Sequence, residues 1–159
     1  MTSQSSLDLH IQEMIEKIEH LCGRKGPAAK CLDDVVALLH DQVPHYTWVG
    51  IYLVKGADLI LGPYRGKPSP HTTIAIGEGI CGAAAAQKQT IVVPDVNADS
   101  RYLACSLETK SEIVVPIMDG AVCIGEIDID SDLPDAFTEH DQQLLEAVAT
   151  KIAPLVKKL

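Results

Sequence analysis

The first part of the chain shows apolar residues at helical spacing. Between Leu7 and Leu21 they lie along one stripe of a helix, and after the break GRKGP (23–27) a second stripe runs to about Val43. Such a period places the apolar side chains on one face of each helix. The pattern predicts two amphipathic N-terminal helices within residues 7–43.

The period changes after residue 46. The segments TWVGIYLV (47–54) and DLILGPYRG (58–66) flank the short Gly-containing loop KGA, and SEIVVPIM (111–118) and AVCIGEIDID (121–130) flank the dipeptide DG. Strand-like segments joined by such loops are typical of antiparallel hairpins. We therefore expect an antiparallel sheet across residues 47–131.

Two further segments interrupt this sheet region. GEGICGAAAAQKQ (77–89) indicates a glycine-rich turn into a short helix, and IVVPDV (91–96) indicates a strand whose proline favours an edge position. A last apolar stripe runs through residues 138–159, where Thr138 and Asp141 resemble a capping box. Helices, a meander, an inserted helix, a hairpin and a final helix predict a single α+β domain over residues 1–159.

Composition narrows the functional classes. The chain of 159 residues has 47% hydrophobic and 22% charged residues and a formal net charge of −9. These fractions are typical of a soluble globular domain, and the absence of a basic patch argues against nucleic acid as a partner. We find no signal-peptide pattern at the start and no apolar run of membrane-spanning length, so we expect no membrane association and a cytoplasmic location.

The five cysteines do not form a recognisable framework. They stand at an odd count with no C-x-x-C pair, so we expect neither a disulfide scaffold nor a structural metal site. Cys22, Cys31 and Cys123 lie within or beside apolar patterns, which favours packing roles. Cys81 follows a glycine turn at a helix start, where the helix dipole favours the thiolate; a small packing residue is the equally open alternative. Cys105 lies in a polar, unpatterned loop.

Two motifs match the residue pattern of a cofactor or metal signature but lack the context that the signature requires. GEGICG (77–82) fits G-x-G-x-x-G, but that fingerprint belongs to a parallel βαβ unit, which this hairpin-built chain lacks. DIDSDLPDAFTE (128–139) has acids at calcium-loop positions but Leu133 in place of the required glycine. We therefore expect neither a cofactor nor a metal.

The acidic residues of GEIDID make the most informative pattern. In a strand Glu126, Asp128 and Asp130 share one face, and Glu112 in the paired strand can join them. Clustered carboxylates require a cation or a shared proton unless the face meets solvent, which is the alternative reading. Trp48 and Tyr52, two aromatics at even spacing on one strand face, favour a pocket.

The order of elements resembles a GAF domain, and several motifs are more specific. They resemble the free methionine-(R)-sulfoxide reductase family over about residues 47–146. The motifs are WVGIYL, LGPYRGKP, GICGAAA, PDV, LACS, SEIVVPI and IGEIDIDS. The resemblance implies a central antiparallel sheet with the N- and C-terminal helices packed on one face and a ligand pocket on the other.

The resemblance also implies residue roles. Cys105 matches the catalytic cysteine, whose thiolate attacks the sulfoxide sulfur and becomes a sulfenic acid. Glu112, Asp128 and Asp130 match acids that hold the substrate amine and assist protonation, and Trp48 and Tyr52 match pocket residues. It further implies a thioredoxin-type reductant.

The family's usual resolving cysteine follows GKP, whereas this chain has GKPSPHT. Cys81 could resolve Cys105 from the pocket side of the sheet, an outside thiol could do so, or the domain could bind a ligand without turnover. The hypotheses are thus a thiol-dependent reductase of free methionine-(R)-sulfoxide, a GAF sensor of a small ligand, and a domain that forms a homodimer through its terminal helices.

Overall fold

The computed structural model describes residues 3–104 and 106–159. Its helices and strands, in chain order, are α1 (Ser3–Cys22), α2 (Ala28–Gln42), β1 (Trp48–Lys55), β2 (Asp58–Arg65), β3 (Thr73–Ala75), α3 (Gly79–Gln87), β4 (Ile91–Val93), a 3₁₀ turn (Val96–Ala98), β5 (Ser111–Asp119), β6 (Val122–Ser131) and α4 (Glu139–Val156). None of the helices in the described part of the chain has the length and apolar character needed to span a membrane.

The strands form one antiparallel sheet. The six strands follow the order β3-β2-β1-β6-β5-β4, so β6 and β1 occupy its centre. Both predicted hairpins are confirmed, and Gly56 and Gly120 turn them with φ of 64° and 60°. The predicted edge position of residues 91–93 is also confirmed, since β4 pairs only with β5 in this order.

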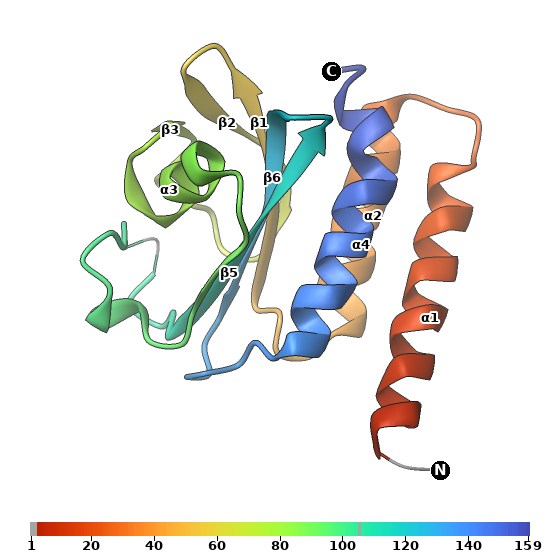
Figure 1. The fold of residues 1–159 in the computed structure, drawn as a ribbon, viewed down its shortest axis with the longest axis horizontal. Helices are drawn as coiled ribbons and strands as arrows, with labels where there is room; N and C mark the ends of the chain where they lie inside the picture. Colours follow the sequence, from red (N-terminus) through yellow and green to blue (C-terminus); the bar gives the residue numbers. More distant parts are fainter. Residues whose placement is uncertain (1–2, 105) are drawn as a thin grey trace.

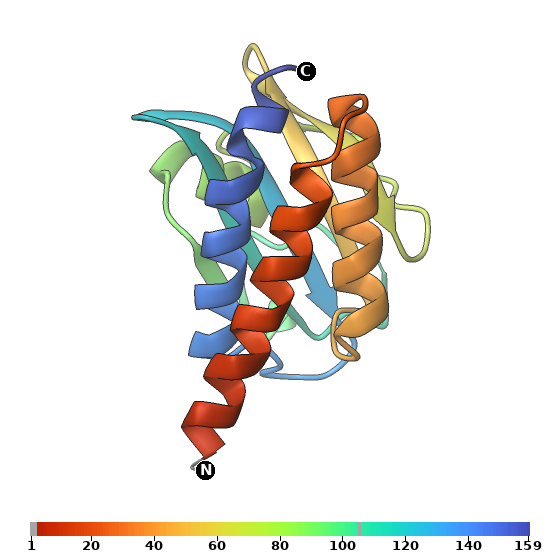
Figure 2. The same cartoon turned by 90° about the vertical axis from the view of Figure 1, so that its right-hand side faces the viewer.

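Different elements pack on the two faces of the sheet. Helices α1, α2 and α4 lie on one side, whereas α3 and the loop that follows β4 lie on the other (Figure 1). The view turned by 90° shows α1 on the outside of α2 and α4 (Figure 2). The predicted α+β arrangement, with terminal helices on one face, is confirmed.

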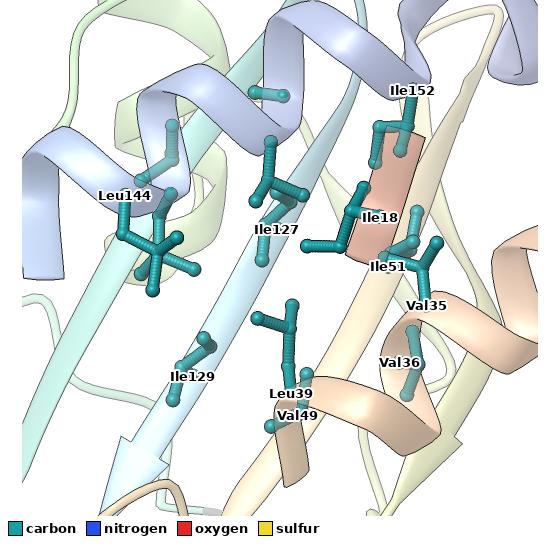
Figure 3. Packing of buried hydrophobic residues seen from close by; sticks show 14 of the residues in the cluster. Ile18, Val35, Val36, Leu39, Val49, Ile51, Ile127, Ile129, Leu144 and Ile152 are labelled. Carbon is teal, nitrogen blue, oxygen red and sulfur yellow. The ribbon is translucent and has the colours of Figure 1, made fainter. Parts of the chain in front are cut away.

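Every second side chain of the central strands β1 and β6 packs into the core between the sheet and the helices. Val49, Ile51, Ile127 and Ile129 point toward the helices, where they meet side chains of α2 and α4 such as Leu39 (Figure 3). All are nearly inaccessible to solvent. Because successive strand residues point to opposite faces, the residues between them must face the other side.

The start of α4 is fixed by Asp141. One carboxylate oxygen accepts the backbone N–H of Thr138 at 2.8 Å, which confirms the predicted capping box. The other oxygen accepts the Tyr46 hydroxyl at 2.7 Å and lies 2.8 Å from His45 Nε2. Burial opposes ionisation of Asp141, but the hydrogen bonds from His45, Thr138 and Tyr46 lower its pKa.

The helix-side core predicts a strong effect of truncation. Ile127→Ala removes a side chain that is 1% exposed, so the free energy of unfolding should fall by about 2–5 kcal/mol. Val122→Ala on the same strand is the control, because Val122 is 60% exposed; it should change stability by less than about 0.5 kcal/mol. Equal losses in urea unfolding would contradict this assignment of the two positions.

Candidate active site

Strand register places the acidic residues together on the face away from the three helices. In β6, Glu126, Asp128 and Asp130 alternate with the core isoleucines. Asp130 stands opposite Trp48 of β1 and Glu112 of β5. The expectation that Glu112 joins the strand acids is therefore confirmed by the pairing.

These carboxyl groups are buried. Exposure is 0% for Glu126, 3% for Asp128 and Asp130, and 5% for Glu112, which overturns the alternative that the face meets solvent. Glu112 lies beside the two aspartates, since it stands opposite Asp130 in the strand pair and one of its carboxylate oxygens is within 4.8 Å of an oxygen of Asp128. Carboxyl groups that are buried this close together cannot all be ionised, so the cluster retains protons or recruits a cation.

Several carboxyl oxygens remain unsatisfied. Both oxygens of Glu126 and one oxygen each of Asp128 and Asp130 are buried and have no hydrogen-bond partner among the described residues. Buried polar atoms in folded proteins are normally hydrogen-bonded, and exceptions often mark a site where a ligand or ion supplies the partner. The arrangement is prepared to accept a small cationic group.

Burial also sets the protonation of the cluster. It raises the pKa of Asp128 to about 6. Burial, and next the charge of Asp128, raise the pKa values of Glu112, Glu126 and Asp130 well above their usual range. At neutral pH the cluster therefore retains protons that it can donate, and full ionisation requires a neighbouring positive charge.

Cys81 lies on the same side of the sheet, as predicted. It is the third residue of α3 and 6% exposed, and its Sγ is 3.9 Å from Glu112 Oε1. The turn before it needs glycine, since Gly77 and Gly79 have φ of 97° and 67°. The expected preference for thiolate is wrong, because burial and then the charges of Asp128 and Glu126 raise the pKa of the Cys81 thiol.

The two predicted aromatic residues flank the acids. Trp48 stacks on Tyr64 with ring centroids 5.7 Å apart, and its Nε1 donates to the Lys67 carbonyl at 2.9 Å. Its ring lies over Gly50, where a Cβ would come within 2.3 Å of it. Tyr52 donates its hydroxyl proton to the His71 carbonyl at 2.7 Å. Both aromatics thus hold the 67–71 segment against the sheet.

Two spaces adjoin the acid cluster. A cavity of about 20 Å³ is lined by Tyr52, His71, Cys81, Glu112 and Asp128, together with apolar residues. A cleft of about 300 Å³ lies between Trp48, the 66–69 segment and residues 106–109, with Asp130 and Asp132 in its wall. The first holds about one water-sized group, and the second has room for the body of a small ligand.

Contacts between loops border these spaces. Lys67 forms an ion pair with Glu108, and His71 Nε2 is 3.1 Å from the Ala104 carbonyl oxygen. Sequence reasoning missed His71 and Lys67 as lining residues, because loop residues carry no periodic signal. The segment in which the resemblance predicts a resolving cysteine contains His71, and this residue faces the acid cavity.

The structure brings together most of the predicted site. Cys81, Glu112 and Asp128 lie in one cluster, and Asp130 stands opposite Glu112 beside it. Cys105, the predicted catalytic cysteine, lies outside the described residues. Its role stays a prediction.

Comparison with known proteins gives the family. The GAF domain model matches residues 27–154. GAF domain-containing protein A of Dictyostelium discoideum is 36% identical, covering 92% of either chain. The free methionine-R-sulfoxide reductase of Escherichia coli (strain K12) is 35% identical over 76% of this chain and 73% of its own length.

A solved structure shows the same relationship. The free methionine-R-sulfoxide reductase from Neisseria meningitidis, in complex with its substrate, matches with a TM-score of 0.89 and 32% identity over 99% of this chain and 92% of that chain. The fold is that of a GAF domain. The chain belongs to the GAF domain family and, within it, to the family of the free methionine-R-sulfoxide reductases.

The protonated state of Glu126 predicts how stability depends on pH. Because its folded-state pKa lies above the ordinary glutamate value of 4.5, the folded chain binds more protons than the unfolded chain above that pH. Glu126 therefore lowers the free energy of unfolding, and this destabilisation grows as the pH rises from 4.5 toward the folded-state pKa. Glu126→Gln should therefore gain stability relative to the parent chain between pH values of about 4.5 and 8.

The gain should grow as the pH rises, because the proton that the folded chain retains on Glu126 costs more free energy at higher pH. Thermal unfolding at several pH values measures it. Glu13→Gln, at an exposed position of α1, controls for the loss of one acidic side chain. A stability difference for Glu126→Gln that stays constant across this pH range would show that Glu126 is not held protonated.

Proposed function

We propose that this protein reduces free L-methionine-(R)-sulfoxide to methionine in a thiol-dependent reaction. The observation that carries the proposal is the buried acid cluster with unsatisfied oxygens beside an aromatic-walled cleft. Free methionine sulfoxide supplies the ammonium that such a cluster requires, and the methyl group on its sulfur suits an aromatic wall. The names of the relatives point to the same substrate class.

The acids divide between binding and proton transfer. In the proposed complex the substrate ammonium lies against Asp128, Asp130 and Glu112, and a carboxyl group that retains its proton donates to the sulfoxide oxygen. Lys67 at the rim of the cleft offers a positive charge for the substrate carboxylate. Methionine within a peptide lacks the free ammonium, so the pocket should select the free amino acid.

The chemical step begins at Cys105. Its thiolate attacks the sulfoxide sulfur, the oxygen takes up protons and transfers to the cysteine, and methionine leaves while a sulfenic acid remains. A second thiol then displaces the hydroxyl group as water and forms a disulfide. A thioredoxin-type dithiol reduces that disulfide, which requires a reducing compartment such as the cytoplasm.

A binding function without turnover is the second candidate. Residues 68–73 contain no cysteine, and His71 faces the cavity where this segment approaches the acids. A GAF domain with this pocket would hold a small amino-acid-like ligand and report its presence. Pairing of two chains through the terminal helices also stays a prediction; α1 leaves Leu7 and Leu9 exposed.

Turnover distinguishes these functions. The reduced protein, incubated with free methionine-(R)-sulfoxide and a thioredoxin system, should release methionine in amounts far above one equivalent, measured by chromatography. Cys105→Ser should abolish release while it retains substrate binding, whereas Cys22→Ser, on the far side of the molecule, should leave it unchanged. Saturable binding with no methionine release would establish the binding module instead.

Resolution of the sulfenic acid gives a separate prediction. Cys81 is the thiol that lies against the acid cluster in the described residues, and a neighbouring carboxylate such as Asp128 can accept its proton as it attacks. We expect a peptide linked through Cys81 and Cys105 after one equivalent of substrate, detected by mass spectrometry. A lasting sulfenic acid, or a mixed disulfide with added thiol, would show that an external thiol resolves it.

A further inference from the structure

Three potential metal ligands meet at the acid cavity. The Cys81 sulfur and one carboxylate oxygen each from Glu112 and Asp128 all lie within 4.8 Å of one another. They come from α3, β5 and β6, three elements that are separate along the chain. The local residue spacings match no metal-ligand pattern, so no metal site was predicted from the sequence, and only the fold assembles this group.

A second observation points to a bound cation. Asp128 Oδ1 is buried without a hydrogen-bond partner among the described residues, and so are both oxygens of the neighbouring Glu126. Glu126 stands two residues before Asp128 on β6, so its carboxyl group faces the same side of the sheet as these ligands. One divalent cation would satisfy several of these oxygens and offset their charge at the same time.

The size of the space matches a single ion. The cavity bounded by Cys81, Glu112 and Asp128 has a volume of about 20 Å³, which is room for roughly one water-sized group. The body of an amino acid must lie elsewhere, in the neighbouring cleft of about 300 Å³. The acid cavity can therefore take an ammonium group or a metal ion, but not both.

The donor atoms select the kind of metal. Zinc accepts cysteine sulfur together with carboxylate oxygen and is commonly bound by three protein ligands and a water. Magnesium and calcium prefer sites made of oxygen alone. We propose that the reduced protein binds one Zn²⁺ ion through Cys81, Glu112 and Asp128. Binding releases the proton of the Cys81 thiol to solvent, so affinity rises with pH.

The site has a consequence that rests on the proposed function. The zinc ion and the substrate ammonium would compete for Glu112 and Asp128, so the zinc form should not turn over. A disulfide at Cys81 would remove the thiolate ligand and release the ion. The metal would thus protect the reduced thiol and inhibit the reaction, whereas the ion site itself does not depend on turnover.

Cobalt offers a direct probe of this site. The reduced full-length chain should bind one equivalent of Co²⁺ with a thiolate-to-cobalt charge-transfer band, and Zn²⁺ should displace it. Cys81→Ser should lose the band and weaken Zn²⁺ binding, measured against a chelator, by at least about tenfold, since even outer-shell changes cost about 10–100-fold. Cys22→Ser should keep both the band and the affinity.

Two further variants make the test decisive. Cys105→Ser should keep the band although it removes the proposed nucleophile, so absence of turnover and absence of the metal site are separate results. If Cys81→Ser fails to fold by circular dichroism, Asp128→Asn should keep the band with weaker Zn²⁺ binding. No thiolate band in the parent chain, a band that survives in folded Cys81→Ser, or a band lost in Cys105→Ser would each overturn the proposal.

Discussion

The burial of several carboxyl groups on one face of the central strand is the constraint on which the rest of the site depends. Carboxylates that approach one another in a medium of low polarity cannot all be ionised, so they retain protons or recruit a cation. In this protein Glu112, Asp128 and Asp130 lie buried together on this face, and Glu126 is fully buried on the same strand as the two aspartates. A pocket built in this way is selective for a positively charged group before any other contact is made.

The fold makes this costly arrangement possible by separating two tasks. The isoleucines of β6 face α2 and α4 and form a dense apolar core, which supplies the stability. The alternate residues of the same strand face α3 and the loops, where they form the site. One face of β6 therefore contributes stability and the other forms the site. A shift of the strand pairing by one residue would exchange the two faces.

Short-range periodicity in the sequence predicted the helices, the hairpins and the alignment of the acids, whereas the layered arrangement was an expectation from the family resemblance. It could not establish that the acids are buried, since strand alternation is equally compatible with a solvent-exposed face. Their cover comes from α3 and from loop residues such as His71, whose positions depend on contacts distant in the chain. The protonation of Cys81 was predicted wrongly for the same reason: the helix start was visible in the sequence, but the surrounding carboxyl groups were not.

The central claim is that the acid cluster recognises a cationic amine and gives up protons when one arrives. Calorimetry with Cys105→Ser, which cannot turn over in this account, tests it in two buffers of different ionisation enthalpy near neutral pH. Free methionine-(R)-sulfoxide should bind saturably with net release of protons, because its ammonium favours ionised carboxyl groups, and the analogue without the amine should not bind. Equal affinity for the two compounds, or binding without proton release, would contradict the account.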